Sequence, residues 1–96
     1  MDIHYSLKNF STQEKVMLEQ YMEKKIVSLE HAALRFAPAP HVLEVRAEQF
    51  TKKKAFNVTL HLKTSRGVVL ASEDDHTIAE ALDLAKDKLV RQLTKK

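Results

Sequence analysis

Cysteine is absent from this chain of 96 residues, and glycine occurs only once. Without cysteine, the chain has no disulfide framework, no thiolate nucleophile and no thiolate zinc site. A single glycine is too few for a phosphate-binding loop or a dinucleotide-binding fingerprint, because both need several glycines at fixed spacing. The GXXG loop of KH modules and the aromatic signature of RRM modules are missing as well. These absences exclude several common nucleotide-binding and RNA-binding motifs.

Long apolar runs are also lacking. No stretch approaches the ~20 apolar residues that a membrane-spanning helix needs, and the N-terminal sequence MDIHYSLKNF lacks the apolar segment of a secretory signal. The chain is 44% hydrophobic and 30% charged, which is typical of a globular domain rather than a disordered segment. We therefore expect a single domain over residues 1–96 that lies in the cytoplasm and has no membrane partner.

Candidate catalytic and metal-ligating residues form no recognisable motif. The five histidines are scattered: His4, His31, His41, His61 and His76. None has HxH or HExxH spacing, although His41 and His61 are predicted on neighbouring strands, so we expect surface histidines and no metal site. Glu73–Asp75 precede a predicted helix, where carboxylates favour the positive end of the dipole. No serine has a base and an acid at motif spacing, so the chain is not expected to be an enzyme or to need a cofactor or small-molecule substrate.

Local patterns predict a strand followed by a helix in the first forty residues. Residues 2–7 alternate apolar and polar side chains, which is typical of a half-buried strand. Ser11 and Glu14 have capping-box spacing and predict a helix over about 12–31. Its apolar face carries Leu18, Tyr21, Met22 and Leu29. The APAP sequence at 37–40 contains two prolines and ends helical structure.

Three further strands and a closing helix are predicted after the prolines. The strands cover about 42–48, 55–63 and 68–72, and Gly67 supplies the left-handed residue of the last hairpin turn. Thr77 and Glu80 form a second capping-box pattern, which opens a helix that ends at about Thr94. The order β-α-β-β-β-α predicts an α+β fold, in which a four-stranded sheet carries two helices on one face.

Charge is unevenly distributed along the chain. Residues 1–50 carry six Lys or Arg against seven Asp or Glu, whereas residues 51–96 carry ten against six. This asymmetry indicates a polyanionic partner. A solvated helix end is the alternative, since lysines also favour the C-terminal dipole. Lys52, Lys53 and Lys54 lie in a predicted loop that either contacts phosphate or is simply solvated.

Helical spacing divides the closing helix into a structural face and a binding face. Its apolar face is expected to rest on the sheet and carries Ile78, Leu82, Ala85, Leu89 and Leu93. Lys88, Arg91 and Lys95 form a second stripe that this register leaves free to bind, and Lys86 lies on the opposite flank. Asp83, Asp87 and Glu80 occupy the outer side, where they can pair with basic neighbours.

The first helix carries two adjacent lysines with different expected directions. Lys24 points away from the apolar stripe. Lys25 falls within the stripe, so it is expected to reach across toward the second helix.

Three segments resemble a known family. The stretch ALDLAKDKLVRQLTK (81–95) is similar to the second helix of the ribosome hibernation promoting factor and ribosome-associated inhibitor family, also called sigma-54 modulation proteins. YMEKKIVSLE (21–30) resembles its first helix, and VTLHLKTSRGVVLAS (58–72) resembles its third and fourth strands. The resemblance spans nearly the whole chain and agrees with the element order read from the residues. Ser28 departs from it, because the family usually has a basic residue there.

The resemblance implies a protein that binds the small ribosomal subunit between head and body. There it would contact 16S rRNA and nearby ribosomal proteins, cover the decoding region and the tRNA and mRNA paths, and promote ribosome hibernation under stress or in stationary phase. The family's basic positions correspond to Lys25, Lys88, Arg91 and Lys95, with Lys86 and Lys24 as weaker neighbours. Among subgroups the chain resembles the short form without a C-terminal dimerisation domain, which implies a monomer off the ribosome. Two alternatives remain open: a generic module for structured RNA and a small protein-interaction domain.

Overall fold

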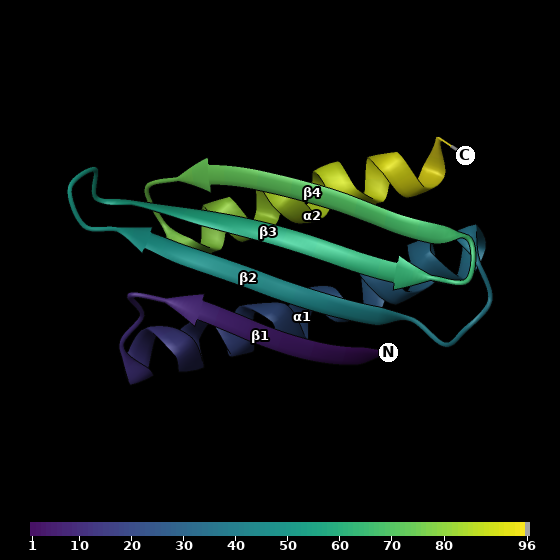
Figure 1. Ribbon diagram of the computed structural model, residues 1–96, viewed down its shortest axis with the longest axis horizontal. Coiled ribbons are helices and arrows are strands. Elements are labelled where there is room, and N and C mark those ends of the chain that lie inside the picture. The colour runs from purple at the N-terminus through teal and green to yellow at the C-terminus, as the bar shows by residue number, and fades with distance from the viewer. Residues whose placement is uncertain (96) are drawn as a thin grey trace.

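The computed structural model describes residues 1–95 and contains four strands and two helices (Figure 1). The elements are β1 (Asp2–Lys8), α1 (Thr12–Phe36), β2 (Val42–Phe50), β3 (Ala55–Thr64), β4 (Gly67–Asp75) and α2 (Ile78–Thr94). This order confirms the predicted β-α-β-β-β-α sequence of elements.

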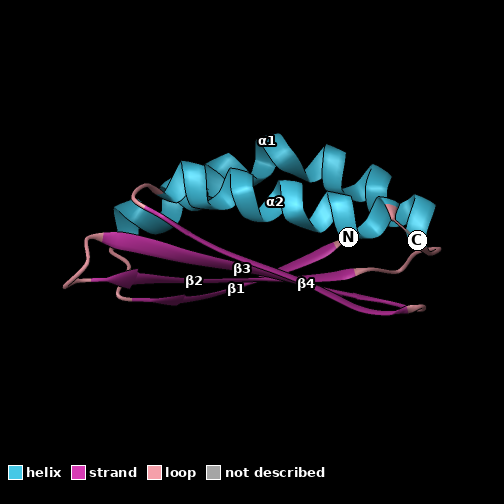
Figure 2. Cartoon of the chain, turned by 90° about the horizontal axis from the view of Figure 1, so that it is seen from above, coloured by secondary structure: helices cyan, strands magenta, loops and turns pink. Residues whose placement is uncertain are grey.

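The four strands form one mixed sheet in the order β1-β2-β3-β4. β1 pairs in parallel with β2, and the other two pairs are antiparallel. A parallel pair needs a crossover connection, which α1 supplies, whereas short turns join the antiparallel strands. Both helices lie on the same face of the sheet (Figure 2), as predicted, and no helix within residues 1–95 covers the other face. The outer strands β1 and β4 are therefore edges.

The core lies between the helices and the covered face of the sheet. Strand alternation turns Leu43 and Val45 of β2 and Leu60 of β3 toward the helices, where all three are fully buried. All five residues of the predicted apolar face of α2 are at most 5% exposed: Ile78, Leu82, Ala85, Leu89 and Leu93. Leu18, Met22 and Leu29 of α1 are buried opposite them. The predicted orientation of α2 is confirmed.

Helix α1 begins as predicted but ends later. The amide of Glu14 donates to the Ser11 hydroxyl at 3.1 Å, and the Ser11 amide donates to the Glu14 carboxylate at 2.9 Å, which completes the capping box. The predicted end near residue 31 is wrong, because the helix continues to Phe36. Ala33 and Phe36 extend the buried face by a further turn, and no helix-breaking residue occurs before Pro38.

Strand β4 is also longer than predicted and includes Glu73–Asp75. These acids therefore end an edge strand, whose last residue Asp75 lies two positions before the Thr77 N-cap of α2, and the helix-dipole interpretation stays a prediction. The capping box predicted at Thr77 is half formed: the Thr77 hydroxyl accepts the Glu80 amide at 3.1 Å. The Glu80 carboxyl instead hydrogen-bonds the Asp75 carboxyl, which raises the pKa of Glu80.

The prediction that all histidines lie on the surface is wrong for His41, which is only 4% exposed. Its Nε2 lies 2.8 Å from the Ala37 carbonyl oxygen, so a hydrogen bond satisfies this buried nitrogen. His41 precedes β2, and His61 pairs in register with Glu44 rather than with His41. Gly67 has φ of 122°, which confirms the positive-φ residue expected in the last hairpin.

Candidate nucleic-acid interface

The basic stripe of α2 lies beside the edge strand β4. The Lys88 ammonium is 3.5 Å from the Ser72 carbonyl oxygen and 3.8 Å from the Glu73 carboxylate. The Gln92 side-chain amide donates to the Leu70 carbonyl at 2.9 Å. Both contacts occupy carbonyls of an edge strand, which would otherwise offer acceptors to another strand. They hold this flank of α2 close to the sheet.

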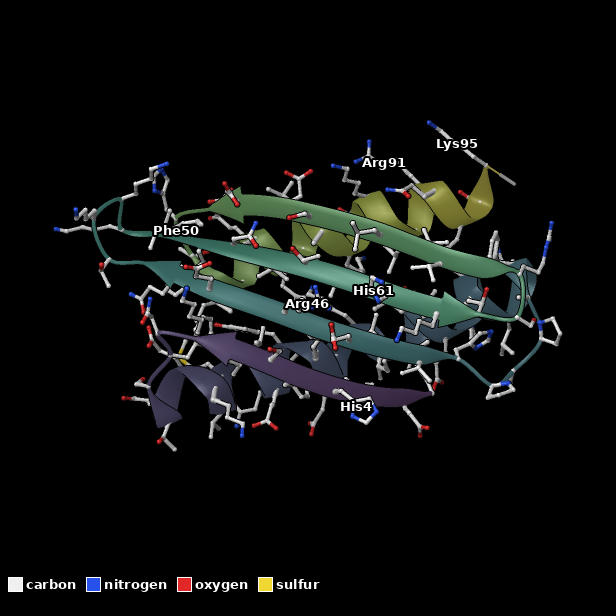
Figure 3. All side chains as sticks on the ribbon, in the orientation of Figure 1. His4, Arg46, Phe50, His61, Arg91 and Lys95 are labelled. Carbon is white, nitrogen blue, oxygen red and sulfur yellow. The ribbon has the colours of Figure 1, made fainter. Side chains whose placement is uncertain are left out.

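Arg91 and Lys95 are the most accessible cations of the stripe. Both are exposed, and Figure 3 shows them projecting outward beyond β4. The Arg91 guanidinium donates to the Asp87 carbonyl at 3.4 Å within the helix, which leaves its other donors toward solvent. Together with Lys88, Glu73 and Gln92 they line a shallow pocket of about 280 Å³. Lys88 is thus less free to bind than its spacing predicts, because Glu73 lies beside it.

Lys25 reaches from α1 to α2, as its position in the apolar stripe predicts. Its ammonium forms an ion pair with the Asp83 carboxylate, and its side chain is 21% exposed. Lys86 is equally covered and pairs with Asp87 at 3.0 Å. Lys24 lies on the solvent side of α1 and is exposed.

The candidate cations other than Lys24 therefore form two basic areas and not one. Lys88, Arg91 and Lys95 lie on the β4 side of α2, whereas Lys86 lies on the side that faces α1 and Lys25. Helical spacing places Asp83 and Asp87 between these two flanks, on the outer side of α2. A polyanion that approaches both areas at once must displace or tolerate these two carboxylates.

Sequence reasoning left one aromatic residue unnoticed. Phe50 ends β2 beside the lysine-rich loop, and the Lys53 ammonium lies 5.9 Å from the centroid of its ring. Strand alternation contains the missed signal: with Leu43, Val45 and Ala47 facing the helices, residue 50 must face the other side. Phe50 therefore lies on the sheet face that no helix of residues 1–95 covers, whereas an aromatic residue of the core is buried between the sheet and the helices.

The part of the chain that the structure describes contains neither a metal site nor a membrane-spanning helix. Within residues 1–95, no three His, Asp or Glu side chains gather closely enough to hold a metal ion. Neither described helix is apolar enough along its length to cross a membrane. The feature that remains is a set of exposed cations on rigid helices, which suits phosphate groups.

Comparison with known proteins places these features in a family. The family model described as "Sigma 54 modulation protein / S30EA ribosomal protein" matches residues 3–96. The fold is similar to the crystal structure of the Thermus thermophilus Protein Y N-terminal domain, with a TM-score of 0.76 and 22% identity over 99% of this chain and 98% of that one. A ribosomal subunit interface protein from Coxiella burnetii gives a TM-score of 0.65 and 17% identity over 99% and 96%. Among curated protein sequences, none matches this chain.

Proposed function

The chain belongs to the sigma 54 modulation protein / S30EA ribosomal protein family, and we propose that it binds the small ribosomal subunit and inhibits translation. The family is one of ribosome-associated proteins and not a class of enzymes. The proposed site on the subunit is the region of the decoding centre and the tRNA and mRNA paths, where 16S rRNA supplies the phosphates. Ribosome hibernation under stress or in stationary phase, in the cytoplasm, is the proposed setting.

The observation that carries this proposal is the pair of exposed cations Arg91 and Lys95 on one flank of α2. Lys88 adds a third positive charge one turn earlier, partly balanced by Glu73. Folded RNA is recognised mainly through its shape and its phosphates, and contacts of this kind position a protein without reading base sequence. Packing of α2 on the sheet fixes the backbone from which these cations project, so the protein contacts phosphates without rearrangement of the helix.

The protein is proposed to inhibit translation by occupying its site on the small subunit and not by catalysing a reaction. A folded protein seated on the decoding region excludes the tRNA and mRNA that need the same space. The protein is proposed to act as a monomer, because one copy suffices for this exclusion. Pairing of idle ribosomes would be a further consequence of the bound state and would need contacts outside this site.

Co-sedimentation with purified small subunits, large subunits and a free RNA duplex of matched length tests the proposal. We expect the protein to pellet with small subunits, to bind the duplex at least tenfold more weakly, and to inhibit translation in a purified system. Equal affinity for the duplex would favour a generic module for structured RNA. A protein-interaction domain would be favoured if the protein failed to bind rRNA stripped of ribosomal proteins but still bound the isolated ribosomal proteins. Either result would overturn the assignment.

A further inference from the structure

The hairpin between β2 and β3 presents an unpaired cluster of positive charge. Its turn, Thr51–Lys54, is exposed throughout and contains three consecutive lysines. Within residues 1–95, no carboxylate lies within ion-pair distance of these lysines. Lys54 adopts φ of 48°, the left-handed region that closes a turn but is unfavourable for a residue with a Cβ. The charges are therefore concentrated at one defined point of the surface.

Phe50 lies immediately beside these lysines and is only partly buried. The core also has partly buried aromatics packed against it, such as Phe10 and Phe56, but among residues 1–95 Phe50 is not one of them. Instead the Lys53 ammonium lies over its ring, 5.9 Å from the centroid. A ring that is not needed for core packing can accept an external partner when Lys53 moves off its face.

A shallow pocket of about 300 Å³ joins the ring to the lysines. Asn9 and Gln49 line it together with Phe50, Lys52 and Lys53. The Asn9 side-chain amide donates to the Gln49 carbonyl at 3.3 Å, which fastens the end of β2 to the loop after β1. Glu48 also lines the pocket, but Lys8 lies 3.8 Å from its carboxylate. Amide groups, an aromatic face and cations are thus held within one small area.

This combination matches the chemistry of single-stranded RNA. An unstacked base offers a flat surface to an aromatic ring, and the phosphates on either side of it meet the lysines. An acidic peptide would satisfy the lysines but would leave the ring without a role. The same site favours a strand over a duplex, since bases inside a helix have no free face to stack on Phe50.

We propose that Phe50 and Lys52–Lys54 form a second RNA-contact site, which takes a single-stranded segment with one base stacked on the Phe50 ring. The identification of that RNA as ribosomal rests on the proposed function; binding of a free strand does not. Figure 3 shows Phe50 and Lys95 toward opposite ends of the molecule, whose longest extent is 39 Å. Contacts at both ends fix the orientation of the protein on its RNA, and the first contact raises the effective concentration for the second.

A tryptophan reporter tests the stacking directly. The chain contains no tryptophan, so Phe50→Trp introduces a single indole emitter. Titration with a ten-nucleotide oligouridine is expected to quench its fluorescence at low salt. Leu34→Trp, at a position of α1 that is 54% exposed, is the control and should show little quenching. Equal responses of the two variants would overturn stacking at Phe50.

Affinity measurements separate the ring from the charge. Phe50→Leu keeps an apolar side chain and is expected to weaken oligouridine binding about fivefold or more, with an unchanged salt dependence. Lys52→Gln/Lys53→Gln/Lys54→Gln is expected to weaken binding about tenfold or more and to reduce the log–log salt slope by roughly 2. The charge-matched control removes three exposed cations elsewhere: Lys15→Gln, Arg35→Gln and Lys63→Gln. Circular dichroism confirms that each variant is folded.

The same variants are then titrated with small ribosomal subunits. A second contact on the ribosome is supported if both loop variants bind oligouridine more weakly than the control does, and also bind small subunits more weakly. If both loop variants bind oligouridine like the control, the inference is overturned, even when wild-type protein binds subunits normally. Loop-dependent binding of oligouridine without any subunit binding overturns the proposed function and leaves the RNA site standing.

Discussion

Lys25 of α1 and Asp83 of α2 form an ion pair that joins the two helices. The pair gives Lys25 a structural role that competes with RNA binding, because Asp83 already neutralises its charge. Asp83 itself is more exposed, with 52% of its side chain accessible. Lys25 can therefore contribute to phosphate binding only if its link to Asp83 is weak.

Asp83→Asn is expected to change stability and affinity in opposite directions. Loss of the ion pair should lower the free energy of unfolding by about 0.2–1 kcal/mol, the usual range for accessible pairs. Removal of the same carboxylate should strengthen small-subunit binding by about two- to fivefold, because Lys25 gains freedom and one repulsive charge disappears. Urea unfolding and filter binding measure the two effects. Unchanged affinity would place Lys25 outside the interface.

Charge reversal at the end of α2 tests the exposed cations. Arg91→Glu/Lys95→Glu should abolish most small-subunit binding and restore translation, since two phosphate attractions become repulsions on a rigid helix. The fold should survive, because exposed substitutions usually alter stability by only about 0.5 kcal/mol each. Lys15→Glu/Lys63→Glu makes the same change of charge at exposed positions elsewhere and should retain binding. If both pairs bind equally well, the stripe is not the interface.

Lys88→Glu should behave differently from Arg91→Glu. The introduced carboxylate would face Glu73, whose carboxylate is now 3.8 Å from the Lys88 ammonium. We therefore expect Lys88→Glu to lower the melting temperature as well as affinity, whereas Arg91→Glu should lower affinity alone. Thermal unfolding followed by circular dichroism distinguishes them. Identical melting temperatures would show that the Lys88–Glu73 contact contributes nothing to stability.

Binding to small subunits should weaken steeply as salt rises. About four or five phosphate contacts predict a slope of roughly −3 to −4.5 in a log–log plot of affinity against salt concentration. Filter binding across a series of potassium chloride concentrations measures this slope. A flat response would indicate an apolar contact surface and would remove the electrostatic basis of the proposal.

Leu89→Ala should destabilise the protein by about 2–5 kcal/mol, because it opens a cavity between α2 and the sheet. Leu89 is completely buried, whereas Leu84, on the same helix, is 42% exposed and provides the control. Leu84→Ala should change the free energy of unfolding by about 0.5 kcal/mol or less. Urea denaturation at constant pH compares the two, and similar losses would contradict the observed orientation of α2.

Element order, both helix starts and the buried face of α2 followed from the sequence alone. Each depends on residues that are close in the chain: Ser11 with Glu14, or leucines that recur every three to four positions. Lys25 was also placed correctly, because a cation inside an apolar stripe has few directions available. Such signals need no knowledge of which strands are neighbours.

Only the tertiary structure decided which residues the candidate binding side chains contact. Lys88 meets Glu73 because β4 is an edge strand beside α2, and the sequence alone did not reveal this strand order. The division of the basic residues into two areas depends on the same arrangement. The burial of His41 has a different cause: its hydrogen bond to Ala37 spans only four residues, but both residues lie between α1 and β2, where no periodic pattern indicates which side chain faces inward. Periodicity determines which side of an element faces inward, but the partners on each side are determined by packing between elements that are distant in the chain.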